Sequence, residues 1–234
     1  MMRSGVAVGR AAGCIAVLLA VSAVARETPA SQEVEALVRS GGDSAALSRN
    51  PSSGAFVLRN LSVETHGADA RSRCAAFLSA NLGAWVRSAA GVAADVSREE
   101  KSDNGTTVHF SLSVDGVPVH NGRIRVFEGS SGRIERVQSD LPWDMPVLGT
   151  FEISEERAGR IAREVAAAHP GARGPVALRS VRKVYHASRA GLVPAYRCAF
   201  LTADLVSSYS LVVHAASGEM LARMPLARTE GGTP

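Results

Sequence analysis

The stretch "HFSLSVDGVPVHNGRIRVF", residues 109–127, decides the fold that we predict for this chain. Apolar and polar side chains alternate from Val108 to Val114, as in a strand with one buried face. Asp115 and Gly116 follow, and this pair is typical of a type I′ turn, in which both central residues need positive φ. The sequence therefore predicts an antiparallel hairpin.

The return strand changes phase partway along its length. Its apolar residues are odd-numbered at Val117 and Val119 and even-numbered at Ile124 and Val126. Because strand side chains alternate strictly, the buried face survives this change only if an extra residue is inserted. Asn121-Gly122 lies at the change and tolerates bulge dihedrals, so the sequence predicts a kink there and needs no ligand to explain the glycine.

The N-terminus predicts export. Arg3 and Arg10 precede a short apolar run that ends on Ala23-Val24-Ala25, the pattern of a secretory signal peptide over residues 1–25, cleaved near Ala25. The alternative is an uncleaved anchor, although the apolar run is short for one. We expect a secreted or periplasmic protein with no stable membrane insertion after cleavage.

The charge of the processed chain argues against nucleic acid as a partner. Loss of Arg3 and Arg10 lowers the formal charge from +4 to +2. The remaining Lys and Arg residues form no basic block interleaved with aromatic residues. Cys74 and Cys198 remain after processing; both lie among apolar residues, as buried free thiols often do, and a disulfide between them is the alternative.

The remaining chain divides into segments by composition. We expect a loosely packed leader at 26–54 with a short helix in "SQEVEALVR", then a strand in "AFVLRNLSVE", a helix over 69–87 and a solvated charged turn in "SREEKSDNG". Pro142, Pro146 and Gly149 indicate a linker at 142–152.

A second helix is expected in "ISEERAGRIAREV", with Ser154 as its N-cap. Three or four alternating strands are expected to follow, and residues 227–234 form a tail.

The two halves have the same plan. "VFEGSSGRI" aligns without a gap with "VVHAASGEM", which places Gly132 and Gly218 at equivalent turns. The predicted fold class is α+β, with two small domains, 55–141 and 153–226, each a helix packed on an antiparallel meander in the manner of cystatin-like or PepSY-like folds.

Chemistry-bearing patterns are missing from the sequence. No two of the six histidines are four residues apart, and no nucleotide-binding loop or nucleophile elbow occurs. His109, His120, His186 and His214 fall on or near strands, where we expect them to face solvent; the alternative is a metal site formed by some of them converging in space. We expect no catalytic residue, no metal ligand and no cofactor.

Residues 108–141 resemble the fungalysin/thermolysin propeptide domain, which has an alternating strand, a "GVPV" segment, a glycine-containing bulge and an apolar hairpin. The residues that carry the resemblance are Asp115, Gly116, Val117, Pro118, Val119, Asn121, Gly122 and Gly132.

The second half resembles a PepSY domain. "LVPAYRCAF" with Tyr196 and "LVVHAASGEMLAR" with Gly218 match its strands. His214 and Ser217 replace the usual Asp and Thr, so a weakened turn contact is expected at His214.

The resemblance implies a binding protein and no enzyme. Such pro-regions inhibit a secreted zinc metalloprotease and assist its folding, so the expected partner is a metalloprotease catalytic domain, and the kinked hairpin is a shaped binding scaffold. One alternative is the pro-region of a zinc endopeptidase whose catalytic part is absent from this chain. Another is a general envelope-stress or structural module.

Overall fold

The computed structural model describes residues 29–40, 42, 44–87, 91–168, 176–202 and 208–225. The segments that we predicted as a signal peptide (1–25), as the start of the leader and as a tail (227–234) lie outside these residues. The first half contains α1 (Pro29–Ser40), β1 (Ala46–Arg49), β2 (Phe56–Arg59), α2 (Ala70–Ala80), the 3-10 helix η1 (Leu82–Ala84), β3 (Val92–Ser102), β4 (Gly105–Val114), β5 (Val117–Gly129) and β6 (Ile134–Ser139).

The second half contains α3 (Glu155–Ala167), β7 (Val176–Ala187), β8 (Leu192–Thr202), β9 (Tyr209–His214) and β10 (Met220–Pro225). All strand pairs among the described residues are antiparallel except that of β5 with β7. The predicted α+β class, with helices on antiparallel meanders, is confirmed. Within the described part of the chain, no helix has the length and apolar character needed to cross a membrane.

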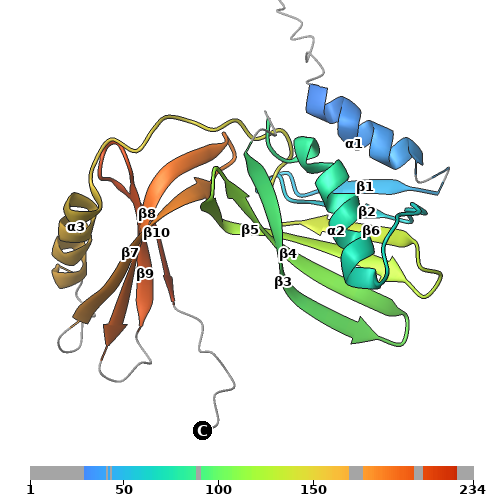
Figure 1. Ribbon diagram of the computed structural model, residues 1–234. Helices are drawn as coiled ribbons and strands as arrows, with labels where there is room; N and C mark the ends of the chain where they lie inside the picture. Colours follow the sequence, from blue (N-terminus) through green and yellow to red (C-terminus); the bar gives the residue numbers. More distant parts are fainter. Residues whose placement is uncertain are drawn as a thin grey trace, which may run out of the picture.

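The first half is a sheet with one covered face. Its strands run in the order β1-β2-β6-β5-β4-β3, and α2 lies across the buried face (Figure 1). Most of the predicted inward residues of β4 and β5 are buried, namely Val108, Phe110, Leu112, Val114, Val119, Ile124 and Val126, and Val117 is half-buried. Asp69 caps α2 by accepting a hydrogen bond from the Ser72 backbone N–H at 2.7 Å.

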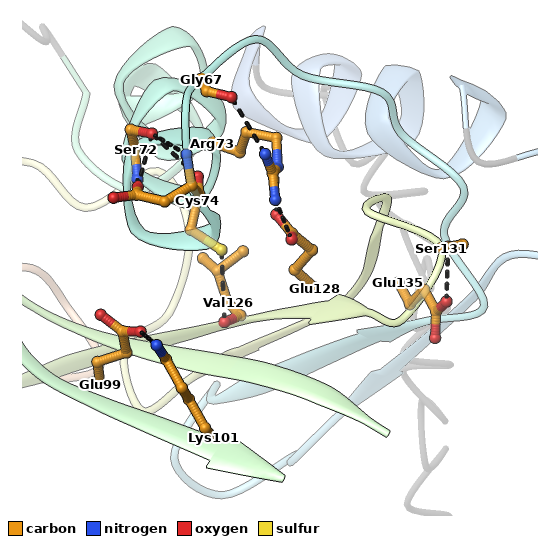
Figure 2. A network of polar contacts seen from close by, with 11 residues as sticks. Gly67, Ser72, Arg73, Cys74, Glu99, Lys101, Val126, Glu128, Ser131 and Glu135 are labelled. Atoms are coloured by element: carbon orange, nitrogen blue, oxygen red, sulfur yellow. Dashed lines mark hydrogen bonds and ion pairs between the residues drawn. The ribbon is translucent and has the colours of Figure 1, made fainter. Parts of the chain in front are cut away.

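An ion pair fixes α2 to the sheet. Arg73 of α2 donates from Nε and Nη2 to the two carboxylate oxygens of Glu128 on β5, at 2.8 and 2.7 Å, as Figure 2 shows. Arg73 also donates to the Gly67 carbonyl. Glu128 is 5% exposed, so this two-bond contact satisfies a carboxylate that would be costly to bury alone.

The predicted hairpin and kink are both present. Asp115 and Gly116 have φ of 49° and 75°, as a type I′ turn requires, and Asn121 has φ of 63°. Along β5 the register passes from Pro118 to Arg123 while β4 advances only from Ser113 to Ser111. The insertion is therefore three residues and not the single residue that we expected; any odd number restores the buried face.

The inserted residues of β5 pair with the second half. Val119 lies opposite Tyr185 and His120 opposite His186, in a short parallel ladder with β7. Strand β5 thus has three neighbours, β4, β6 and β7, and links the two meanders into one ten-stranded sheet (Figure 1). The division into domains at 55–141 and 153–226 stays a prediction.

The second sheet carries α3 on the face away from the first half (Figure 1). Ser154 caps this helix as predicted, accepting from the Arg157 N–H at 3.3 Å. The α3 side of the sheet buries Tyr196, Cys198, Phe200, Leu211 and Val213. Residues 169–171, where Pro170 and Gly171 should end this helix, lie outside the described residues.

The leader is more ordered than we predicted. Val34 and Leu37 of α1 are 2% and 7% exposed and belong to the core of the first half, and β1 pairs with β2. The physical reason is their spacing of three residues, which places both side chains on one face of the helix.

The structure also corrects the prediction that the charged segment 97–105 is a turn. Most of it belongs to β3, and only residues 103–104 form the turn into β4. The side chains of 97–102 are exposed on both faces of β3, so no apolar alternation marked this part as a strand. The helix expected over 69–87 ends at Ala80 and is followed by η1.

The segment predicted as a linker is packed against both halves. Asp144 is 9% exposed and accepts two hydrogen bonds from Arg87, at 2.9 and 2.7 Å. The Met145 N–H donates to the Trp85 carbonyl, and the Leu148 N–H donates to the Leu192 carbonyl. The segment is therefore fixed to the first half at Met145 and to the second half at Leu148.

We expect Leu37→Ala to destabilise the protein by about 2–3 kcal/mol, because it removes a buried side chain that α1 packs against the core. Urea denaturation of the wild type and the variant measures this difference. Glu35→Ala, on the exposed face of the same helix, is the control and should change little. An unchanged free energy of unfolding in Leu37→Ala would show that α1 is not docked.

We expect Gly116→Ala to lower the free energy of unfolding by about 1–2 kcal/mol. A Cβ at Gly116 meets no atom within 4 Å, so the whole effect comes from its φ of 75°. Gly116→Asn is the matched control and should cost less, because Asn tolerates this backbone region. Equal losses for the two variants would contradict the turn assignment.

Candidate functional site

The residues singled out by the sequence serve mainly as backbone and core elements. Gly116, Gly132 and Gly218 have φ of 75° to 78°, as their turns require. The buried Tyr196 donates its hydroxyl hydrogen to the Ile153 carbonyl at 2.6 Å, which ties β8 to the start of α3. Val117 packs against the first core and Pro118 is exposed.

The remaining motif residues, Val119, Asn121 and Gly122, lie at a cleft. A Cβ on Gly122 would approach the Val119 side chain to 2.8 Å, so the glycine allows the bulge to close on itself. Asn121 Nδ2 lies 3.4 Å from the sulfur of Met224 on β10. Strands β5 and β10, which lie at opposite ends of the strand order β5-β7-β8-β9-β10, are therefore in contact. The second sheet must curl to bring them together.

The curl encloses a cleft of about 240 Å³. It is lined from the first half by β4 and β5 and from the second by β8, β9 and β10. The lining residues are Ser111, Val119, His120, Asn121, Gly122, Arg123, Arg197, Ser210, Met224 and Pro225.

Strand register places the polar groups of the second sheet on the face inside the curl. His120 is opposite His186, Ala199 is opposite Ser210, and Ser210 is opposite Met224. Arg197 lies two residues from Ala199 and so faces the same side. The α3 core occupies the other face, so these groups line a separate environment.

Several buried polar atoms at this place have no hydrogen-bond partner among the described residues. They are His120 Nε2, His186 Nδ1, Arg197 Nε and Ser210 Oγ. Ser210 is completely buried. Buried polar atoms are costly unless satisfied, so a cluster of them at a cleft indicates a site for a polar ligand.

The two histidines are held neutral. Burial, together with the smaller effects of the Arg197 and His186 charges, lowers the pKa of His120 to about 4. Burial also lowers the pKa of His186. An imidazole that is neutral near pH 7 offers one donor and one acceptor, and it costs less to bury beside a guanidinium than an imidazolium would.

The other strand histidines lie elsewhere. His109 Nε2 is 3.3 Å from Glu100 on the outer face of β4. His214 Nδ1 accepts the Ser217 N–H at 3.1 Å and lies 2.7 Å from Ser217 Oγ. The imidazole thus closes the turn that we expected it to weaken. Within the described residues, no three His, Cys, Asp or Glu side chains gather as metal ligands.

The thiols of Cys74 and Cys198 are free and buried. Each lies in a different core, which rules out the disulfide that the sequence left open. Burial raises the pKa of Cys74 to about 12 and that of Cys198 to about 11, so both thiols stay protonated at neutral pH.

Sequence reasoning missed Arg197 and Ser210. Convergence of strand histidines was considered, and the structure brings together His120 and His186. Arg197 has polarity and parity typical of a solvent-facing strand residue. The usable signal was the run Leu211-Val212-Val213 in β9, which is apolar on both faces and so indicates that both faces are covered. In the structure these residues and Ser210 are all buried.

No family model matches this chain, and no curated protein sequence is significantly similar to it. Among solved structures, the Bacillus megaterium YpeB C-terminal domain is similar at 11% sequence identity, with a TM-score of 0.37. The alignment covers 85% of this chain and 96% of that chain.

We expect the protein to lose stability as the pH falls from about 6.5, the ordinary pKa of histidine, to about 4, the pKa of folded His120. In this window the unfolded chain binds the proton and the folded chain does not, so protonation favours unfolding. The loss should be about 1–2 kcal/mol, since His120 is only partly buried and solvent screens part of the effect.

Urea denaturation at both ends of this pH window measures the loss. His120→Gln removes the titrating ring and should flatten the dependence, whereas His66→Gln, at an exposed position, should leave it unchanged. An equal pH dependence in the wild type and in His120→Gln would refute the burial of a neutral His120.

Proposed function

We propose that this chain is an exported, propeptide-like binding protein whose partner is a secreted thermolysin-type metalloprotease. It inhibits the protease or assists its folding, and its own side chains make and break no bonds. The observation that carries the proposal is the hairpin at 109–127. The stretch that resembles the fungalysin/thermolysin propeptide domain folds as a turn and a bulge at the centre of the sheet, with positive φ at Asp115, Gly116 and Asn121.

The second half supports a propeptide domain followed by a PepSY domain. Helix α3 packs on the meander β7–β10, and Tyr196 anchors the start of that helix. His214 replaces the usual Asp and still accepts the backbone N–H of Ser217, so the departure from the PepSY pattern keeps the turn contact.

Strand β3 offers a surface for a protein partner. It is an edge strand of 11 residues whose only neighbour among the described residues is β4, so its outer backbone groups are available for a further strand. Its side chains include Arg98, Glu99, Glu100 and Lys101, which discourage unspecific pairing and favour a partner with complementary charges.

We expect the purified chain from Arg26 onward to inhibit a thermolysin-type protease from the same secretome, at micromolar concentration. A quenched-fluorescent peptide assay measures the residual protease activity. In a second assay, the denatured protease should recover more activity when refolded with this chain than without it. A secreted serine protease is the control and should be unaffected.

If the chain shows neither inhibition nor improved refolding at micromolar concentration, the proposal is wrong. An in-frame HExxH encoded downstream of Pro234 would instead assign the same role to a pro-region acting in cis.

A further inference from the structure

The cleft at the β5 bulge has a chemical character that the binding of a protease does not explain. We propose that it binds a compact carboxylate, supplied by an acidic side chain or by the C-terminus of a polypeptide. The argument uses the charge, the unpartnered atoms and the size of the cleft, and it does not depend on the partner being a protease.

The charge of the cleft favours an anion. Of its ten lining residues, Arg123 and Arg197 are cationic, His120 is titratable, and none is an Asp or Glu. Arginine at a partly buried site attracts an oxyanion more strongly than it does in bulk water, because the local dielectric is lower. The lining therefore has two fixed positive charges and no carboxylate of its own to neutralise them.

The unpartnered atoms match a carboxylate in kind. Arg197 Nε is a donor with no partner in the described part of the chain, and so is the hydroxyl of the fully buried Ser210. His120 Nε2 is a third unpartnered atom and donates when it carries the proton. A carboxylate has two acceptor oxygens and can take the guanidinium edge together with the hydroxyl, which would satisfy these atoms at once.

The size of the cleft limits the ligand to a small group. Its volume of about 240 Å³ is below the range of roughly 300–1,000 Å³ that is typical for pockets of drug-sized ligands. Val119 and Met224 add apolar surface beside the basic groups. A carboxylate on a short aliphatic stem fits this combination, and a nucleotide does not.

The cleft also joins the two halves. Ser111 and Arg123 come from the first half, and Arg197 and Ser210 come from the second. A carboxylate bound between them would contact both, so its binding would stabilise their arrangement. Because an anion beside His120 favours the protonated ring, binding should also tighten as the pH falls.

The test is a titration of the ¹⁵N-labelled chain from Arg26 onward with two probes. N-acetylaspartate α-amide carries only a side-chain carboxylate, and N-acetylalanine carries only a terminal one. We expect at least one of them to shift the resonances of His120, Arg197 and Ser210, with a Kd of about 10 mM or tighter. The stronger probe identifies the source of the carboxylate. The matched neutral amides, N-acetylasparagine α-amide and N-acetylalanine amide, should shift none of them.

Variants test the assigned residues. Arg197→Gln should weaken binding by about tenfold or more and Ser210→Ala by a few fold, which corresponds to the loss of a charged and of a neutral hydrogen bond. The control is Arg182→Gln. Arg182 lies opposite Arg197 across β7 and β8 but is exposed and does not line the cleft. The two-dimensional spectrum of each variant reports its fold, and Ser210→Ala is small enough to test the site if Arg197→Gln unfolds.

Four results would overturn the proposal. They are the absence of saturable shifts at the cleft with either carboxylate, equal shifts with the neutral amides, equal weakening by Arg182→Gln and Arg197→Gln, and clearly tighter binding of inorganic phosphate than of both carboxylates.

Discussion

The parallel pairing of β5 with β7 is the constraint on which the rest of this structure depends. Val119 and His120 can reach Tyr185 and His186 only because three extra residues let β5 leave its ladder with β4. The same insertion restores the buried face of β5 from Ile124 onward, so one irregularity serves both the core of the first half and the link to the second. The hairpin is therefore first of all the joint between the two halves of the molecule, whatever surface it also presents.

The joint has a polar consequence. It brings β5 against the inner face of a curled sheet, where Arg197 and Ser210 would otherwise face solvent, and it places the half-buried His120 beside them. An apolar seam would be cheaper to bury, since unpartnered polar groups cost free energy. The retention of these groups is the physical reason for treating the cleft as a ligand site.

The sequence predicted the elements whose signals are local. Alternation from Val108 to Val114, the Asp115-Gly116 turn and the Ser154 cap act within a few residues, and the structure has all three. The second half of strand β3 was not predicted because residues 97–102 are exposed on both faces and therefore show no apolar alternation. The cleft was not predicted for a different reason. The odd or even position of Arg197 in its strand assigns the side chain to one face of the sheet, but only the curl of the sheet decides that this face is covered.

The most direct test of this account is the backbone contact between β5 and β7 in solution. Nuclear Overhauser effects on a labelled chain should connect Val119 with Tyr185 and His120 with His186 in the pattern of parallel strands, and ¹⁵N relaxation should show both halves tumbling together. If these contacts are missing and the halves tumble independently, then β5 is not a joint, and the cleft that depends on it does not form.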